Sequence, residues 1–314
     1  MKIKALLTLI ITLFTITAFA QKQELTLTPH VGEVKNAYNY WLYRPKLDVV
    51  TDSTATDSVA TQYKHKPVVI FLHGASLCGN SLNRVRRYGT IDAIEKGRDI
   101  DAYVIAPQNP GGAWQPKRIM NILEHIINTE YVDTTRVYVL GMSLGGYGTI
   151  DFVAKYPNKV AAAMALCGGG TTSDYEALNQ VPLWVVHGTA DRAVSVTQSD
   201  KVVSQMKAKG GAERLIYNRV PGWTHGTPAR LFYLNESYEW LMQHSLTDNN
   251  REVATNSIIA SNLIAHAYDG LSRSKSNTKV KVTNVKGGDI KKSYSKKKKS
   301  KSKAKKSKKR KRRK

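Results

Sequence analysis

A serine within a glycine-rich turn is the first candidate for chemistry in this chain. Residues 141–145 read Gly-Met-Ser-Leu-Gly, between an apolar, β-branched run at 136–140 and helical spacing over 146–156. Such a tight strand-to-helix turn strains the serine backbone and requires small residues two positions to either side, which Gly141 and Gly145 supply. We therefore predict that Ser143 is a nucleophile. The alternative is a glycine-rich turn with an idle serine.

An acid and a base follow the serine in the order that a nucleophilic serine needs. The strand pattern at 183–187 runs into a loop that carries Asp191, and the pattern at 214–217 precedes a loop that carries His225. A serine hydroxyl is a poor nucleophile at neutral pH unless a base takes its proton and a third group orients that base. We predict Asp191 as the orienting acid and His225 as the base, whereas His187 at the end of its strand is assigned to packing.

Acyl transfer also requires hydrogen-bond donors for the oxyanion that develops. The continuous apolar run at 68–72 predicts a central strand, and His73-Gly74-Ala75-Ser76 follows at once. The backbone N–H of Leu144, directly after the nucleophile, is one expected donor. The N–H of Ala75 is the other, with Gly74 and Ser76 as alternatives.

With these residues in place, the chain resembles the esterases of the α/β-hydrolase family. It is most similar to feruloyl and acetylxylan esterases and polyhydroxybutyrate depolymerases, which grade into predicted peptidases of the prolyl oligopeptidase type. The resemblance covers about residues 37 to 244 and implies an α/β fold with a mostly parallel central sheet flanked by helices. The similar stretches are 68–74, 106–108, 133–148, 167–170 and 187–194.

Further strands are predicted at 39–45, 101–106 and 160–166, and helices at 119–128 and near 231–244. The Ser-, Thr- and Asp-rich stretch at 48–64 is predicted as a surface loop. Trp114, in an irregular loop after the strand at 101–106, is predicted to line the substrate cleft, with packing as the alternative. Trp223, which precedes His225, is predicted to contact substrate; many relatives place the aromatic residue after the histidine instead.

The two ends of the chain differ from the middle. Residues 1–20 combine Lys2 and Lys4, an apolar stretch and an Ala-x-Ala site, which predicts a signal peptide and a secreted or periplasmic protein; a retained anchor is the alternative. The catalytic domain is predicted over 21–250, and patchy helical spacing over 251–272 predicts an appended helix. Residues 273–314 hold 22 of the 48 Lys and Arg residues and one of the 24 acidic residues. The rest of the chain therefore has 26 basic and 23 acidic residues, so most of the net charge lies in residues 273–314.

That charge block predicts a disordered tail, because like charges repel and no apolar pattern could form a core. It would bind a polyanion such as envelope lipid, acidic polysaccharide or DNA, or serve only as a solubilising tail. Cys78 and Cys167 in an exported chain allow one disulfide, with two buried free thiols as the alternative. The spacing predicts no metal site and no cofactor.

Together these features predict a secreted serine esterase that acts through an acyl-enzyme. A serine peptidase is the alternative within enzymes, because the same triad cleaves amides. The alternative of another class is a polyanion-binding surface protein with a vestigial hydrolase domain, against which the intact set Ser143, Asp191 and His225 argues.

Overall fold

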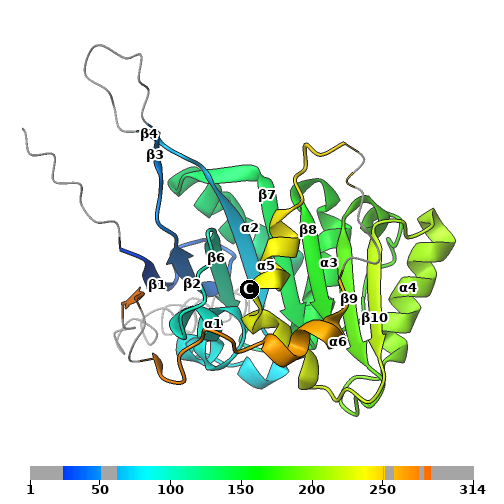
Figure 1. Cartoon of the computed structure of the whole chain (residues 1–314). Coiled ribbons are helices and arrows are strands. Elements are labelled where there is room, and N and C mark those ends of the chain that lie inside the picture. The colour runs from blue at the N-terminus through cyan, green and yellow to red at the C-terminus, as the bar shows by residue number, and fades with distance from the viewer. Residues whose placement is uncertain (1–23, 51–61, 250, 252–257, 276–278, 284–314) are drawn as a thin grey trace, which may run out of the picture.

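One twisted sheet organises the protein (Figure 1). The computed structural model describes residues 24–50, 62–249, 251, 258–275 and 279–283. Within these residues a nine-stranded sheet has the order β10-β9-β8-β7-β5-β6-β2-β1-β11. Its strands are β1 (Thr26–His30), β2 (Asn39–Arg44), β5 (Lys66–Leu72), β6 (Tyr103–Gln108), β7 (Val132–Met142), β8 (Ala162–Leu166), β9 (Leu183–Gly188), β10 (Leu215–Val220) and β11 (Lys281–Val282).

The strands from β10 to β6 are parallel, whereas β2 is antiparallel to both β6 and β1. A parallel sheet covered on both faces needs strands that are apolar on both sides, which explains the uninterrupted hydrophobic runs. In β5, for example, Val69 and Phe71 belong to one core and Val68, Ile70 and Leu72 to the other. Every strand predicted from sequence coincides with a strand of this sheet.

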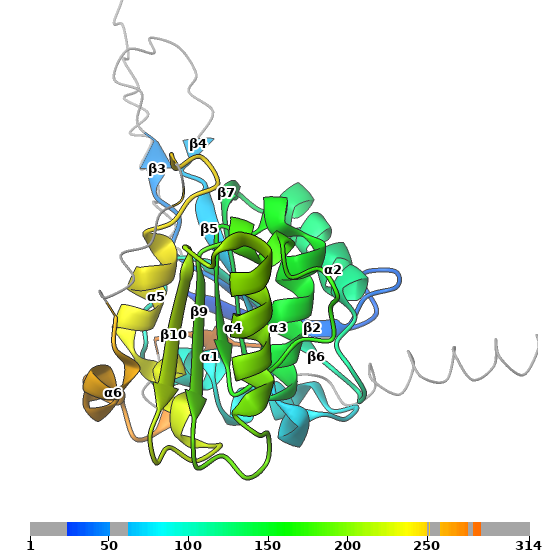
Figure 2. The same cartoon turned by 90° about the vertical axis from the view of Figure 1, so that its right-hand side faces the viewer.

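Helices cover both faces of the sheet, as Figure 2 shows. The apolar residues of α2, α3 and α4 pack in the core on one face. Those of α1, α5 and α6 pack in the core on the opposite face. The predicted helices at 119–128 and 146–156 correspond to α2 and α3, whereas the one near 231–244 is a 3₁₀ helix at Thr227–Tyr233 followed by α5. The bounds are α1 (Thr90–Glu95), α2 (Pro116–Thr129), α3 (Leu144–Lys155), α4 (Thr197–Gly210), α5 (Asn235–Met242) and α6 (Ala260–Leu263).

Two smaller features complete the described fold. The stretch predicted as a loop at 48–64 begins and ends in a short antiparallel pair, β3 (Val49–Val50) with β4 (Gln62–Tyr63), and the residues between them lie outside the described ranges. None of the helices in the described part of the chain is long and apolar enough to cross a bilayer.

The described fold continues past the tail boundary predicted at residue 273. β11 adds a strand beside β1, and Lys275 Nζ lies 2.7 Å from Asp92 Oδ1 and 3.0 Å from Glu95 Oε2. Both carboxylates are buried in α1, so the Lys275 charge is compensated by a tertiary contact that composition does not reveal. The folded domain therefore extends to at least residue 283.

The appended helix predicted over 251–272 is also shorter than expected. Within its described part, α6 spans four residues and continues as a 3₁₀ turn at Ile264–His266. Residues 252–257 and 284–314 lie outside the described residues, as does the predicted signal peptide.

Candidate active site

Ser143 occupies the turn between β7 and α3 in a strained conformation. Its φ of 58° and ψ of −121° are unusual for a residue with a side chain. The turn is held on both sides, because the Ser143 N–H donates to the Leu166 carbonyl at 2.8 Å and the Tyr147 N–H donates to the Ser143 carbonyl at 3.0 Å. The strain expected from the pentapeptide is therefore present, and the surrounding backbone maintains it.

Close approach of two backbones explains the flanking glycines. A Cβ on Gly145 would lie 1.8 Å from the Leu72 carbonyl oxygen, and one on Gly141 would lie 2.4 Å from the Gly145 carbonyl oxygen. Neither position has room for a methyl group, so α3 can begin directly against the end of β5 only with glycine there. This contact sets Ser143 at the carboxyl edge of the sheet.

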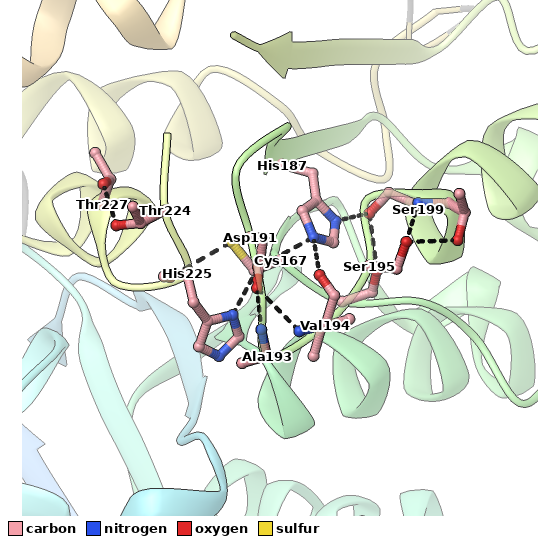
Figure 3. Close-up of polar contacts among 12 residues, drawn as sticks. Cys167, His187, Asp191, Ala193, Val194, Ser195, Ser199, Thr224, His225 and Thr227 are labelled. Carbon is pink, nitrogen blue, oxygen red and sulfur yellow. Dashed lines mark hydrogen bonds and ion pairs between the residues drawn. The ribbon is translucent and has the colours of Figure 1, made fainter. Parts of the chain in front are cut away.

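Asp191 lies in the loop after β9 with a fully buried carboxylate (Figure 3). Its Oδ1 accepts the N–H groups of Ala193 at 2.8 Å and Val194 at 2.9 Å, and its Oδ2 accepts His225 Nδ1–H at 2.7 Å. Burial alone raises the pKa of Asp191, but the hydrogen bonds from Val194, His225 and Ala193 outweigh burial and lower it. The carboxylate is therefore held ionised and aimed at His225.

The tautomer of His225 follows from this contact. An ionised carboxylate can only accept, so in the neutral imidazole Nδ1 carries the hydrogen and Nε2 keeps its lone pair. The His225 side chain is 27% exposed, whereas that of Asp191 is 0% exposed. The imidazole thus has one edge fixed by the buried acid and the other available as a base.

Ser143 and His225 line the same cavity, which has a volume of about 620 Å³. Their strands, β7 and β10, both end at this edge, as do β5 and β9 (Figure 1). Convergence of loops at the carboxyl ends of parallel strands brings together side chains that are far apart in sequence. The lining residues are Gly74, Ala75, Ser76, Tyr88, Met142, Ser143, Leu144, Tyr147, Ala193, Val194, His225, Gly226 and Ala229.

Two backbone amides lie at this cavity, one in the loop after β5 and one at the start of α3. Leu144 is the first residue of α3 and Ala75 the first of a 3₁₀ helix at Ala75–Leu77, so their N–H groups lack intrahelical acceptors. The Gly74 N–H, one of the alternatives, donates instead to the Tyr88 hydroxyl at 3.0 Å. Gly74 is therefore the weaker candidate for an oxyanion donor.

His73 anchors this loop as a neutral imidazole. It is fully buried; the Asn109 N–H donates to Nε2 at 3.0 Å, so the ring hydrogen lies on Nδ1, 2.8 Å from the Gly74 carbonyl. Burial lowers its pKa from 6.5 to about 4. Protonation of Nε2 would remove the acceptor for Asn109 and place a charge in the core.

We expect the protein to lose stability as the pH falls from 6.5 to about 4, because of His73. Between these two pH values His73 is protonated in the unfolded chain and neutral in the folded protein. Below about pH 4 it is protonated in both states, so the loss of stability is complete. A shift of this size corresponds to about 3 kcal/mol at 1.36 kcal/mol per pKa unit. Urea unfolding at pH 7 and pH 4.5 should show a smaller loss for His73→Gln than for the wild type. Equal losses would contradict this assignment; buried His187 and His244 contribute equally to both proteins.

The two predicted substrate-binding tryptophans lie outside the lining of the cavity. Neither Trp114 nor Trp223, both among the described residues, lines the cavity beside Ser143. Trp114 is 4% exposed, and its Nε1–H donates to the His73 carbonyl at 3.2 Å, so it supports the loop from beneath. Trp223 packs against the core, and its carbonyl accepts the Ala190 N–H at 3.0 Å, which ties the His225 loop to the Asp191 loop.

Sequence reasoning missed other residues at the site. Met142, at the end of β7, and Tyr88, Tyr147 and Ala229, from helices and turns, reach the cavity although their patterns give no sign of it. His187, assigned to packing, is indeed buried, but its Nε2 also lies 3.2 Å from Asp191 Oδ2. Its position four residues before Asp191, at the end of a strand, was the available signal.

Both cysteines are free thiols, so the disulfide alternative is not observed. Cys167 is buried with a φ of 46°, and its Sγ lies 3.6 Å from the His225 carbonyl. Burial raises the pKa of the Cys167 thiol. Cys167, Asp191 and His225 offer ligand atoms within 4.8 Å of one another. The Asp191–His225 hydrogen bond accounts for part of that proximity and occupies Nδ1, so we assign no metal to this cluster.

Comparison with known proteins gives distant relatives. No family model matches the chain. A bifunctional acetylxylan esterase/xylanase of Neocallimastix patriciarum is 24% identical over 143 residues, which cover 43% of this chain and 20% of that protein. A probable acetylxylan esterase A of Neosartorya fischeri is 28% identical over 135 residues, covering 43% of this chain and 33% of that protein. The matches thus span at most a third of these relatives.

The fold is shared with solved structures. A thermostable esterase superposes with a TM-score of 0.54 at 24% identity, covering 70% of this chain and 63% of that chain. The chain thus has the α/β-hydrolase fold, and the resemblance to esterases expected from sequence is confirmed.

Proposed function

We propose that this protein is a serine hydrolase that cleaves a carboxylic ester through an acyl-enzyme, with Ser143, His225 and Asp191 as its triad. The observation that carries the proposal is the 2.7 Å hydrogen bond between Asp191 Oδ2 and His225 Nδ1, beside a cavity that Ser143 also lines. Each of the three residues follows a different strand, so chance proximity is a poor explanation.

The proposed reaction uses the proton positions derived above. His225 Nε2 takes the Ser143 hydroxyl proton as Oγ attacks the ester carbonyl, and it then returns the proton to the departing alcohol. Water repeats the sequence on the acyl-enzyme and regenerates Ser143. Asp191 stays ionised throughout and stabilises the imidazolium that forms in each half-reaction.

The backbone N–H groups of Leu144 and Ala75 are the proposed oxyanion donors. Both belong to first helical residues at the cavity, and both are fixed by the close packing of α3 against the end of β5. Loss of one such donor costs about 3–4 kcal/mol of transition-state stabilisation in other enzymes. Their supply by the backbone makes them insensitive to most side-chain substitutions.

The lining of the cavity supports an uncharged ester as substrate. Among the described residues, those that line it include no Asp, Glu, Lys or Arg, and its larger side chains are Tyr88, Met142, Leu144, Tyr147 and Val194. An acidic or basic acyl group would lose its hydration there without a partner. Because both curated relatives are named acetylxylan esterases, acetyl is the first acyl group to test.

We expect hydrolysis of an aryl acetate and no measurable cleavage of the anilide with the same acyl group. The serine peptidase alternative uses the same triad, so the two functions differ in the leaving group and not in the nucleophile. Steady-state rates on p-nitrophenyl acetate and on p-nitroacetanilide make that comparison directly. Acetyl, feruloyl and longer aliphatic esters then rank the acyl groups. Comparable kcat/KM on an acyl-peptide amide would favour the peptidase.

We further propose that the protein acts after export. The basis is residues 1–20, with their basic start, apolar stretch and Ala18-Phe19-Ala20 site, which lie outside the described residues. Cleavage there would leave Gln21 as the new N-terminus. An exported esterase would meet polymeric or extracellular esters. Such esters include the uncharged acetyl esters proposed above as substrates.

A further inference from the structure

Asp191 is held by a second histidine besides His225 (Figure 3). His187, on β9, is fully buried, and its Nε2 lies 3.2 Å from Asp191 Oδ2, the same oxygen that accepts His225 Nδ1–H. The other oxygen, Oδ1, is satisfied by the Ala193 and Val194 amides. Three hydrogen bonds and the close contact with His187 Nε2 thus surround one carboxylate.

The proton on His187 can be placed from its partners. Nε2 lies 3.0 Å from the Val194 carbonyl as well as close to Asp191, and both partners only accept, so Nε2 carries a hydrogen. Nδ1 lies 2.8 Å from the Ser199 hydroxyl, which is itself 2.8 Å from the Gly168 carbonyl. The ring is thereby fixed between α4 and the segment after β8.

We propose that His187 is a positioning residue for catalysis, which fixes the plane of the Asp191 carboxylate so that Oδ2 faces His225. The inference rests on the proposed triad. The two backbone amides restrain only Oδ1, so rotation about the Cβ–Cγ bond is resisted mainly by the donors on Oδ2. One of these, His225, is the group that must change its protonation state in every turnover. His187 supplies the contact with Oδ2 that stays constant.

Two conservative variants separate this role from simple packing. Glutamine can place an N–H near the position of His187 Nε2, whereas asparagine reaches only the position of Nδ1, beside Ser199. We expect His187→Asn to lower kcat about tenfold to hundredfold with little change in KM, which is the size of effect seen when an outer partner of a metal ligand is removed. His187→Gln should restore most of the lost kcat. Initial rates on p-nitrophenyl acetate, with Tm for each variant, give both numbers.

His244→Asn is the matched control, because His244 is also buried but lies at the end of α5, where its Nε2 has no partner in the described structure. It should alter Tm and leave kcat unchanged. An equal fall of kcat in His244→Asn and His187→Asn would overturn the proposal, and so would a folded His187→Gln as inactive as the asparagine variant. If His187→Asn does not fold, His187→Gln is compared with the wild type alone. Near-normal kcat in His187→Gln supports the proposal, and a folded but inactive His187→Gln overturns it.

Ser143→Ala separates the role of His187 from the existence of the triad. Full activity in His187→Asn, together with an inactive Ser143→Ala, would overturn the role of His187 and leave the triad intact. Activity in Ser143→Ala would overturn both, because there would be no triad for His187 to support.

Discussion

Ser143→Ala is expected to lower ester turnover by about four to six orders of magnitude while the protein stays folded. The loss follows because alanine has no hydroxyl that could attack the ester carbonyl. Folding is spared because serine and alanine both carry a Cβ, so the cost of a φ of 58° is the same for each, and the backbone hydrogen bond to Leu166 remains. Initial rates and thermal unfolding of the two proteins measure both effects.

Ser76→Ala is the matched control for this variant. Ser76 lines the same cavity, and its replacement keeps the backbone N–H while removing the side-chain hydroxyl. It should retain most of the wild-type activity. Loss of activity in Ser76→Ala together with near-normal turnover in Ser143→Ala would move the nucleophile and reject the triad.

Asp191→Asn is expected to lower kcat by roughly 10⁴, if the effect of this substitution in serine proteases transfers. Three groups donate hydrogen bonds to the carboxylate, namely two amides on Oδ1 and the His225 imidazole on Oδ2, and His187 Nε2 lies 3.2 Å from Oδ2. An asparagine can satisfy the amides only by turning its NH₂ toward the histidines. His225 would then accept at Nδ1 and carry its hydrogen on Nε2, where it cannot act as a base.

Asp200→Asn is the matched control for Asp191→Asn. Asp200 bonds the Tyr217 hydroxyl at 2.6 Å and Arg219 at the surface, away from the cavity, so Asp200→Asn should leave kcat unchanged. kcat of both variants is measured at one pH near 7, with Tm as the check on folding. A silent Asp191→Asn beside an inactive Asp200→Asn would place the acid elsewhere.

The elements that carry the site could be predicted from sequence because their signals are local. Apolar runs that end in glycine or polar loops mark buried parallel strands, and such strands end at one edge of a sheet. Gly141 and Gly145 mark a turn that leaves no space for a side chain, which the structure explains by the contact with Leu72. The positions of Ser143, Asp191 and His225 after three strands follow from these patterns.

What the sequence did not reveal depends on contacts between distant segments. Trp114 is a residue type that often lines clefts. Its loop instead packs it inside the protein, where its Nε1–H donates to the His73 carbonyl. Lys275 belongs to a basic stretch by composition, but the buried carboxylates of Asp92 and Glu95 draw it into the fold. His187 was correctly expected to be buried; its contact with Asp191 depends on how the loop after β9 folds back.

Two hypotheses about the ends of the chain stay predictions. The signal peptide at residues 1–20 and the polyanion-binding tail lie largely outside the described residues. The structure does change how the tail should be tested. A truncation at residue 273 would also remove Lys275 and β11, so the deletion that spares the described fold begins at residue 284.

A fluorophosphonate probe followed by peptide mapping tests the central claim most directly. The probe reacts with a serine that an adjacent base has activated, so it reports the nucleophile independently of the natural substrate. We expect one adduct, on the peptide that contains Ser143, with loss of ester hydrolysis in proportion to labelling and no adduct in Ser143→Ala. Ester hydrolysis that survives complete labelling, or an adduct on another residue that accounts for the inhibition, would contradict the proposed triad.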